Sequence, residues 1–201
     1  MAAMSSSSLW SFGTAACVTV ACTALGCADS KPPPRWAEGG APLHLVSAQW
    51  SFKGETVDIQ TRGDFAEVLV DGDVELVIDR VGRLYDRHQN PIAVLETDGR
   101  LVGKKDQLLG MVGASYAAKP GRASAWLGFT PTGDILKYSP DGSAESAGRW
   151  VGCQVSPYAQ HACLLVSYAL YWEDEGDEDV DAMGPMTPGY GPGGVGIGVG
   201  R

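Results

Sequence analysis

The sequence predicts a mostly β fold: an antiparallel hairpin meander, partial barrel or short β-solenoid, with one C-terminal helix and a disordered tail. Three observations predict it. Short apolar segments of alternating hydrophobicity lie between turn dipeptides such as Asp71-Gly72 and Asp98-Gly99, which is typical of antiparallel hairpins. A weak repeat runs through the same region. Residues 157–172 then place apolar side chains at helical spacing.

An uncharged apolar stretch near the N-terminus ends at a cysteine. Residues 14–26 have the length of a signal-peptide core, and Cys27 follows the small residues Ala24 and Gly26. The pattern resembles a bacterial lipoprotein signal, which is cleaved before a cysteine that carries fatty acyl chains such as palmitate. We therefore expect residues 1–26 to be a signal peptide, cleavage between Gly26 and Cys27, and lipidation of Cys27.

Two alternatives stay open for the N-terminus, an ordinary cleaved signal and an uncleaved anchor. No basic residue precedes Lys31, although signal peptides usually begin with one, and Met4 offers a second start. The uncharged run over residues 9–26 reaches the lower edge of the transmembrane range, but its Gly, Ser and Thr content weakens that assignment.

The chain divides into four parts: the signal, a linker over residues 27–43, a β-rich domain over 44–172 and a tail over 173–201. Pro32-Pro33-Pro34 favours an extended, semi-rigid spacer in the linker. The expected strands cover residues 44–52, 56–61, 65–70, 74–79, 83–86, 92–96, 100–102, 107–112, 124–130 and 134–138.

The repeat joins the end of one expected strand to the start of the next. Ile78-Asp79-x-x-Gly82-Arg83-Leu84 recurs 17 residues later as Leu95-Glu96-x-x-Gly99-Arg100-Leu101. A related segment, Phe129-Thr130-x-x-Gly133-Asp134-Ile135, lies a further 34 residues on. Repeated hairpins must stack or curl to bury their apolar faces, although any β-meander also yields glycine at regular intervals.

Residues 157–172 favour an amphipathic helix with Pro157 in its first turn, packed on one face of the sheet. A strand over 162–172 is the alternative, since Val, Tyr and Trp favour strands. Residues 184–201 hold eight glycines and three prolines, which predicts a flexible tail. The alternating end, residues 194–200, leaves an edge strand open as a second possibility.

The net charge of −9 is concentrated in one segment. Residues 173–181 hold seven acids and no base, which leaves about −2 on the rest of the chain. The 15 basic residues are scattered through the sequence. This pattern argues against nucleic acid as a partner, because phosphate binding needs clustered Lys and Arg.

If the chain is exported, its cysteines can be assigned to different roles. Cys153 and Cys163 remain as an even pair in an oxidising compartment, which predicts a disulfide. A metal site is the rival hypothesis, because His161 lies two residues before Cys163. The spacing lacks the paired C-x2-C pattern of zinc sites, and a fourth ligand is missing. We expect neither a metal nor another cofactor.

Catalytic patterns are weak. Ser115 lies in Gly113-Ala114-Ser115-Tyr116-Ala117, which approaches a nucleophile elbow but ends in alanine. His88 lies in a turn, and no histidine pair has the i, i+4 spacing of a helical metal site. An envelope hydrolase would need Ser115, His88 and an acid in one place.

The acid run mimics the opening of a calcium loop with Asp177-x-Asp179-x-Asp181. Ala182 replaces the glycine that such a loop requires, and Pro188 stands in place of its last glutamate. The run therefore predicts loose attraction for cations rather than a built site.

Aromatic residues are the main binding signal. We expect Trp50, Trp126, Trp150 and Trp172 to pack in the core. Several of them on one exposed face would stack on sugars or on a protein partner.

The order of segments in this chain resembles that of uncharacterised exported lipoproteins of the myxobacterial type. Three short motifs carry the resemblance: Asp98-Gly99-Arg100, Gly148-Arg149-Trp150-Val151-Gly152-Cys153 and the Gly-Val end over 194–201. The resemblance brings no activity. The sequence predicts a non-catalytic structural or binding module of the cell envelope. Acyl chains would hold it in the inner or outer bacterial membrane, facing the periplasm or the surface, with a protein or glycan partner. The alternatives are the hydrolase and a scaffold that recruits a basic partner through its acidic tail.

Overall fold

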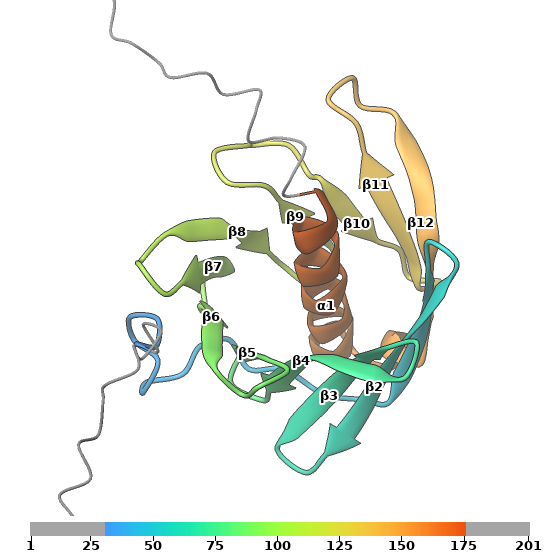
Figure 1. Ribbon diagram of the computed structural model, residues 1–201. Coiled ribbons are helices and arrows are strands. Elements are labelled where there is room, and N and C mark those ends of the chain that lie inside the picture. The colour runs from blue at the N-terminus through green and yellow to red at the C-terminus, as the bar shows by residue number, and fades with distance from the viewer. Residues whose placement is uncertain (1–30, 176–201) are drawn as a thin grey trace, which may run out of the picture. The chain divides into compact units, whose positions relative to one another are not determined.

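Residues 31–175, which the computed structural model describes, form a closed antiparallel barrel around one helix (Figure 1). Each strand pairs with its neighbours in sequence, and β1 pairs with β12 to close the ring. The strands are β1 (Ala48–Phe52), β2 (Glu55–Arg62), β3 (Phe65–Val70), β4 (Asp73–Asp79), β5 (Arg83–Asp86), β6 (Pro91–Leu95), β7 (Arg100–Gly103), β8 (Leu108–Val112), β9 (Tyr116–Ala118), β10 (Leu127–Phe129), β11 (Asp134–Tyr138) and β12 (Ala144–Val151). A 3-10 helix, η1 (Cys153–Val155), and the helix α1 (Pro157–Glu175) follow.

The alternation of the sequence becomes the inner and outer faces of this wall. Val57 and Ile59 on β2 are buried, as are Leu76 and Ile78 on β4, and the residues between them are partly exposed. Successive side chains of a strand point to opposite faces, so these residues line the interior. The prediction of a mostly β fold with a partial barrel is confirmed, and the barrel is closed.

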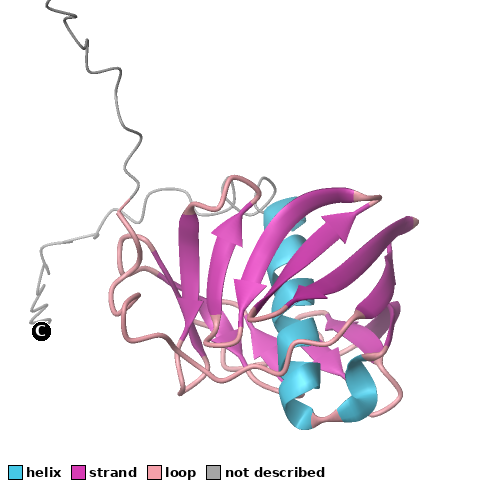
Figure 2. Ribbon diagram, turned by 90° about the horizontal axis from the view of Figure 1, so that it is seen from below, coloured by secondary structure: helices cyan, strands magenta, loops and turns pink. Residues whose placement is uncertain are grey.

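The helix α1 fills the interior of the barrel. Residues 162–168 are all buried, and seven consecutive buried residues cover every face of a helix. A helix that is apolar all round must be enclosed on all sides. Figure 2 shows strands on both sides of it after a quarter turn. A helix over 157–172 is therefore correct, but its expected place on one face of the sheet is wrong.

The barrel is wide enough for this helix because its diameter grows with the number of strands. Contacts with the wall are closest at β8 to β10. There the hydroxyl of Tyr168 donates a hydrogen bond of 2.6 Å to the carbonyl of Leu109. At β1 and β12, the rings of Trp50 and Trp150 fill the space between the helix and the wall, both 1% exposed or less.

Residues 33–45, which we call the strap, cross one end of the barrel. The amides of Gly40, Ala41 and Leu43 donate hydrogen bonds to the carbonyls of Val81, Leu95 and Arg80. Ala41, Leu43 and Leu45 belong to the core. The linker expected over residues 27–43 therefore differs from the structure, where its later part is packed on the barrel.

The antiparallel order gives the barrel two distinct ends. Turns 63–64, 80–82, 96–99, 113–115 and 130–133 share one end with the strap, which we call the strap end. Turns 53–54, 71–72, 87–90, 104–107, 119–126 and 139–143 share the other end. Since α1 starts beside the strap and runs through the barrel, it finishes at this second end, the helix-exit end.

The repeat seen in the sequence is a repeat of turns at the strap end. It covers the turns 80–82, 96–99 and 130–133, and the missing copy falls on the shorter turn 113–115. In each copy of the repeat, the second residue of the motif is hydrogen-bonded to the residue four positions later in the chain. Asp79 accepts a hydrogen bond from the Arg83 amide, Glu96 pairs with Arg100, and Thr130 accepts from the Asp134 amide.

A disulfide joins η1 to α1 at the strap end. Cys153 and Cys163 are bonded, with their Cα atoms 6.3 Å apart. The bond ties the end of the barrel wall to the second turn of the enclosed helix. Within residues 31–175, neither helix has the length and apolarity that a bilayer span requires.

Candidate functional site

A pocket of about 290 Å³ opens at the helix-exit end. Its lining combines three cations, two aromatic rings and two serine hydroxyls. The lining residues are Lys119, Arg122, Ser124, Ala125, Trp126, Lys137, Tyr138, Ser139 and Pro140. They come from the loop between β9 and β10, the end of β11 and the turn that follows it.

Backbone hydrogen bonds hold the two sides of the pocket together. The Trp126 amide donates to the carbonyl of Ala117 at 2.7 Å, and the Tyr138 amide donates to the carbonyl of Trp126 at 2.8 Å. The Tyr138 ring lies against Gly128 on β10, where an added Cβ would come within 2.9 Å of the ring. Glycine at position 128 therefore lets this ring form the wall of the pocket.

The lysines of this end lie against aromatic rings. Lys119 Nζ is 4.6 Å from the centre of the Trp126 ring. Lys137 Nζ and Lys53 Nζ lie 5.8 and 5.7 Å from the centre of the Tyr171 ring, near the end of α1. These distances are in the range of cation–π attraction.

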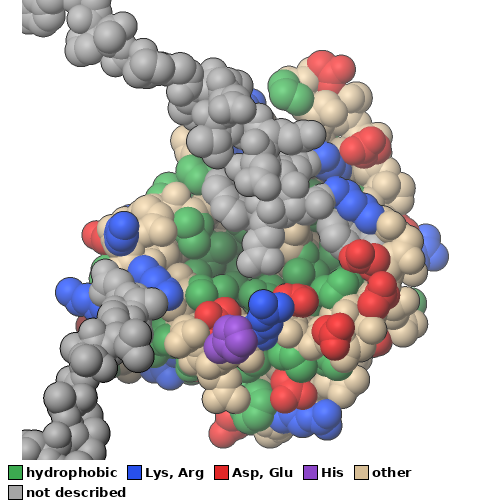
Figure 3. Space-filling view, in the orientation of Figure 1, with side chains coloured by type: hydrophobic (Ala, Val, Ile, Leu, Met, Phe, Trp, Pro, Cys, Tyr) green, Lys and Arg blue, Asp and Glu red, His purple; other side chains and the backbone are tan. Residues whose placement is uncertain are grey.

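The rings connect the pocket to the core. Trp126 and Tyr171 are nearly perpendicular, with centres 6.0 Å apart, and Tyr171 lies 5.8 Å from Trp50. Trp50 in turn stacks on Trp150 at 5.4 Å. Figure 3 shows hydrophobic side chains in the middle of this face, with Lys and Arg side chains beside β11 and β12. The pocket therefore combines charged side chains with aromatic rings that continue into the core.

This arrangement is suited to binding an anion that carries a flat or ring-shaped apolar part. Charge-assisted hydrogen bonds from Lys and Arg to a carboxylate or phosphate are roughly twice as strong as neutral ones. The partly exposed ring of Tyr138 adds stacking surface. Arg122 is exposed at the rim, so its guanidinium is accessible from solvent.

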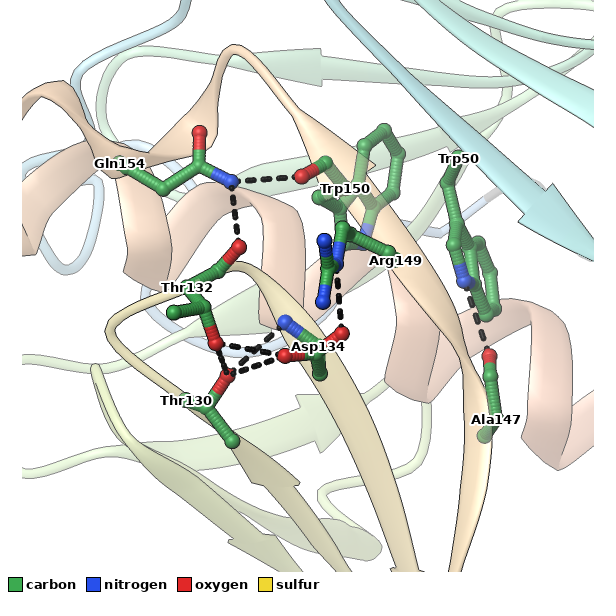
Figure 4. Close-up of polar contacts among 8 residues, drawn as sticks. All are labelled: Trp50, Thr130, Thr132, Asp134, Ala147, Arg149, Trp150 and Gln154. Atoms are coloured by element: carbon green, nitrogen blue, oxygen red, sulfur yellow. Dashed lines mark hydrogen bonds and ion pairs between the residues drawn. The ribbon is translucent and has the colours of Figure 1, made fainter.

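A second polar cluster lies at the strap end, around Asp134 (Figure 4). Its carboxylate accepts hydrogen bonds from Arg149 Nε at 2.6 Å, from the Thr132 hydroxyl at 2.6 Å and from the Thr130 hydroxyl at 3.2 Å. The Gln154 amide nitrogen donates to the carbonyls of Trp150 and Thr132. The cluster locks the turn 130–133 to the end of β12.

The hydrogen bond from Arg149, with those from the threonines, lowers the pKa of Asp134 from 3.8 to about 2. A carboxyl with a lowered pKa stabilises the fold above its unfolded-state pKa, and this contribution is lost as pH falls through the folded value.

We expect Asp134→Asn to lower the urea midpoint at neutral pH. The difference from the wild type should shrink between about pH 4 and pH 2. An equal difference at both ends of that range would contradict this role.

The structure separates the residues that a hydrolase would need. Ser115 lies in the β8–β9 turn at the strap end, and His88 lies in the β5–β6 turn at the helix-exit end. The His88 amide donates to Asp86, and within the described part of the chain no hydrogen bond joins His88 to Ser115. The nucleophile and the base of that hypothesis are therefore not brought together.

The metal hypothesis at Cys153 and Cys163 is also overturned. The disulfide uses both sulfurs, and His161 Nε2 lies 2.9 Å from the carbonyl oxygen of Val112. Burial lowers the pKa of His161, which favours the neutral ring as donor to that carbonyl. Among residues 31–175 no group of three His, Cys, Asp or Glu side chains has metal-binding geometry.

Trp50, Trp126 and Trp150 are buried, which confirms them as core residues. Gly26 and Cys27, with the expected cleavage and lipidation, lie outside the described residues. So do the calcium-like Asp177, Asp179 and Asp181.

The pocket residues Lys119, Arg122, Lys137 and Tyr138 were not among the candidates that the sequence patterns indicated. Lys119 and Arg122 flank a Pro-Gly turn shortly before Trp126, and this was the available signal. Lys137 joins them only through the pairing of β10 with β11, which places Lys137 opposite Leu127.

Comparison of the chain with models of protein families, with curated proteins and with solved structures found no match. The function is therefore argued from the chain's own site.

Proposed function

We propose that this protein is a lipid-anchored binding module of the bacterial cell envelope. Acyl chains on Cys27 would hold it in the membrane, and the pocket at the helix-exit end would bind an acidic sugar. The observation that carries the binding function is the pocket itself. It gathers Lys119, Arg122 and Lys137 around Trp126 and Tyr138 in about 290 Å³.

The chemistry of the lining supports binding rather than catalysis. The lining residues hold no His, Asp or Glu that would serve as a base for Ser124 or Ser139. A serine nucleophile needs such a base within hydrogen-bond reach. Residues of α1 and the large aromatic side chains pack together in the barrel interior.

An acidic sugar matches the three kinds of group in the lining. Its carboxylate pairs with Arg122 or a lysine, its ring stacks on the partly exposed ring of Tyr138, and its hydroxyls bond to Ser124 and Ser139. The volume of about 290 Å³ is at the lower end of small-molecule sites, which suits one or two sugar units. A rim site also leaves the rest of a longer glycan in solvent.

We expect oligogalacturonate to bind the purified protein and neutral oligogalactose of equal length to bind at least tenfold more weakly. Arg122→Ala should weaken oligogalacturonate binding about tenfold or more, since a hydrogen bond to a charged group is worth about 1.5–3 kcal/mol. Isothermal titration calorimetry at two salt concentrations measures this, because the electrostatic part weakens as salt rises.

Lys105→Ala is the matched control. Lys105 is an exposed cation at the same end of the barrel, in the turn 104–107, and lies outside the pocket. Its loss should leave the affinity unchanged. Equal binding of the neutral and acidic glycans, or equal losses in Arg122→Ala and Lys105→Ala, would contradict the proposed site.

A further inference from the structure

The pocket lies where the chain leaves the barrel. The Tyr171 ring, near the end of α1, is 6.0 Å from the Trp126 ring and 5.8 Å from Lys137 Nζ. The helix continues only to Glu175. The segment that follows Tyr171 therefore begins beside the pocket.

That segment is the acid run, residues 173–181, with seven acidic residues and no basic one. The helix-exit end carries Lys53, Lys119, Arg122 and Lys137 around the same point. After the end of α1, the six residues 176–181 reach about 20 Å at most when extended. This reach is sufficient to cross a pocket of one or two sugar units.

We infer that the acid run binds the basic pocket of its own barrel and competes there with the acidic ligand. Attachment through α1 makes the contact intramolecular, at an effective concentration in the millimolar range for a short connection. A carboxylate ligand and the acid run present the same charged group to the same cations. Occupancy by the run would therefore lower the affinity of the pocket for its ligand. The ligand part of this inference rests on the proposed function, whereas the docking part rests on charge and position.

The charges also favour the chain's own run over a separate acidic partner. Four cations lie at the helix-exit end, and seven acids begin two residues beyond Tyr171 in the sequence. A run that docks on its own barrel is less accessible to an external basic partner. The scaffold hypothesis from the sequence predicts the opposite, namely that the acid run stays accessible to an external basic partner.

The test compares the full chain with a variant in which the acid run is neutralised by Asp177→Asn, Glu178→Gln, Asp179→Asn and Asp181→Asn. All four changes lie outside the described barrel. The matched control neutralises the same number of carboxylates on the barrel, by Glu38→Gln, Glu55→Gln, Asp73→Asn and Glu75→Gln. Their side chains make no polar contact within residues 31–175. Both variants therefore change the net charge equally.

Two readouts separate docking from ligand binding. The first is the indole N–H resonance of Trp126, assigned through Trp126→Phe and recorded without ligand. The second is the affinity for oligogalacturonate. We expect neutralisation of the run to shift the Trp126 resonance. It should also raise the affinity of the pocket for oligogalacturonate about tenfold, because the run no longer competes at a high effective concentration. The control variant should change neither.

Each other outcome has a defined meaning. An unchanged Trp126 resonance and an unchanged affinity would overturn the inference and leave the proposed function in place. Equal effects of the two variants would also overturn it, since net charge alone would then account for them. A shifted resonance without oligogalacturonate binding in any variant would support docking of the run and reject the proposed ligand.

Discussion

Replacing Trp150 by alanine is expected to lower the free energy of unfolding by about 3–5 kcal/mol, the range for large aromatic residues removed from a core. The Trp150 side chain is 0% exposed and stacks on Trp50. Its indole N–H donates a hydrogen bond of 2.8 Å to the Ser167 hydroxyl of α1. Removal of the ring opens a cavity between the barrel wall and the helix at the point where β12 closes the ring.

Urea unfolding followed by far-UV circular dichroism measures this loss. Val151→Ala is the matched control, because Val151 is the next residue of β12 and is 66% exposed on the outer face. Its change should stay within about 0.5 kcal/mol. Trp150→Phe keeps most of the volume and removes the hydrogen bond, for an expected loss of about 1 kcal/mol beyond the volume change. Similar losses at positions 150 and 151 would show that the closing strand is not packed as described.

Replacing Cys27 by serine is expected to move the protein from the membrane fraction to the soluble fraction. Each buried CH₂ of an acyl chain contributes about 0.8 kcal/mol, and stable anchoring needs more than one chain. Serine offers no thiol for acylation, so all of this binding energy is lost. Fractionation of cells followed by immunoblotting measures the change.

Cys22→Ser is the control for the Cys27 variant, since Cys22 lies in the same apolar stretch but precedes the expected cleavage point. It should leave attachment intact. Loss of attachment in both variants would point to a general disturbance of the signal, and retention in both would contradict lipidation at Cys27.

Lipidation at Cys27 would also orient the barrel. Pro33 is buried and lies six positions after Cys27, a distance of about 20 Å at full extension. The strap would then hold its end of the barrel near the lipid. The pocket, at the helix-exit end, would face away from the membrane, where an envelope glycan can reach it.

The hairpins were predictable because their signals are local. The expected strands 65–70 and 134–138 coincide with β3 and β11. The repeat of Asp, Glu or Thr four residues before its partner marks the turns of the strap end. Each of these features depends on residues close together in the chain.

The missed strands show where local signals fail. β12 was not expected, because its sequence holds Gly148, the exposed residues Glu145 and Arg149, and only one buried residue, Trp150. It becomes a strand by pairing with β11 and β1, and the Trp50–Trp150 register joins residues a hundred positions apart. Closure of the barrel is a long-range property that no single segment contains.

The strap and the pocket were missed for related reasons. Proline and glycine in residues 32–40 are typical of a linker, yet backbone amides of this segment bind carbonyls of the strap end. The pocket depends on the β10–β11 pairing and on the place where α1 finishes. The position of α1 inside the barrel had a local signal, a run from 162 to 168 in which Ser167 is the one polar aliphatic residue and no residue is charged.

The proposed membrane anchoring depends most directly on the chemistry of Cys27. The intact mass of the protein extracted from its native membrane tests it. A chain that begins at Cys27 and carries added acyl mass is the expected result. An unprocessed chain that begins at Met1 or Met4 would contradict the account.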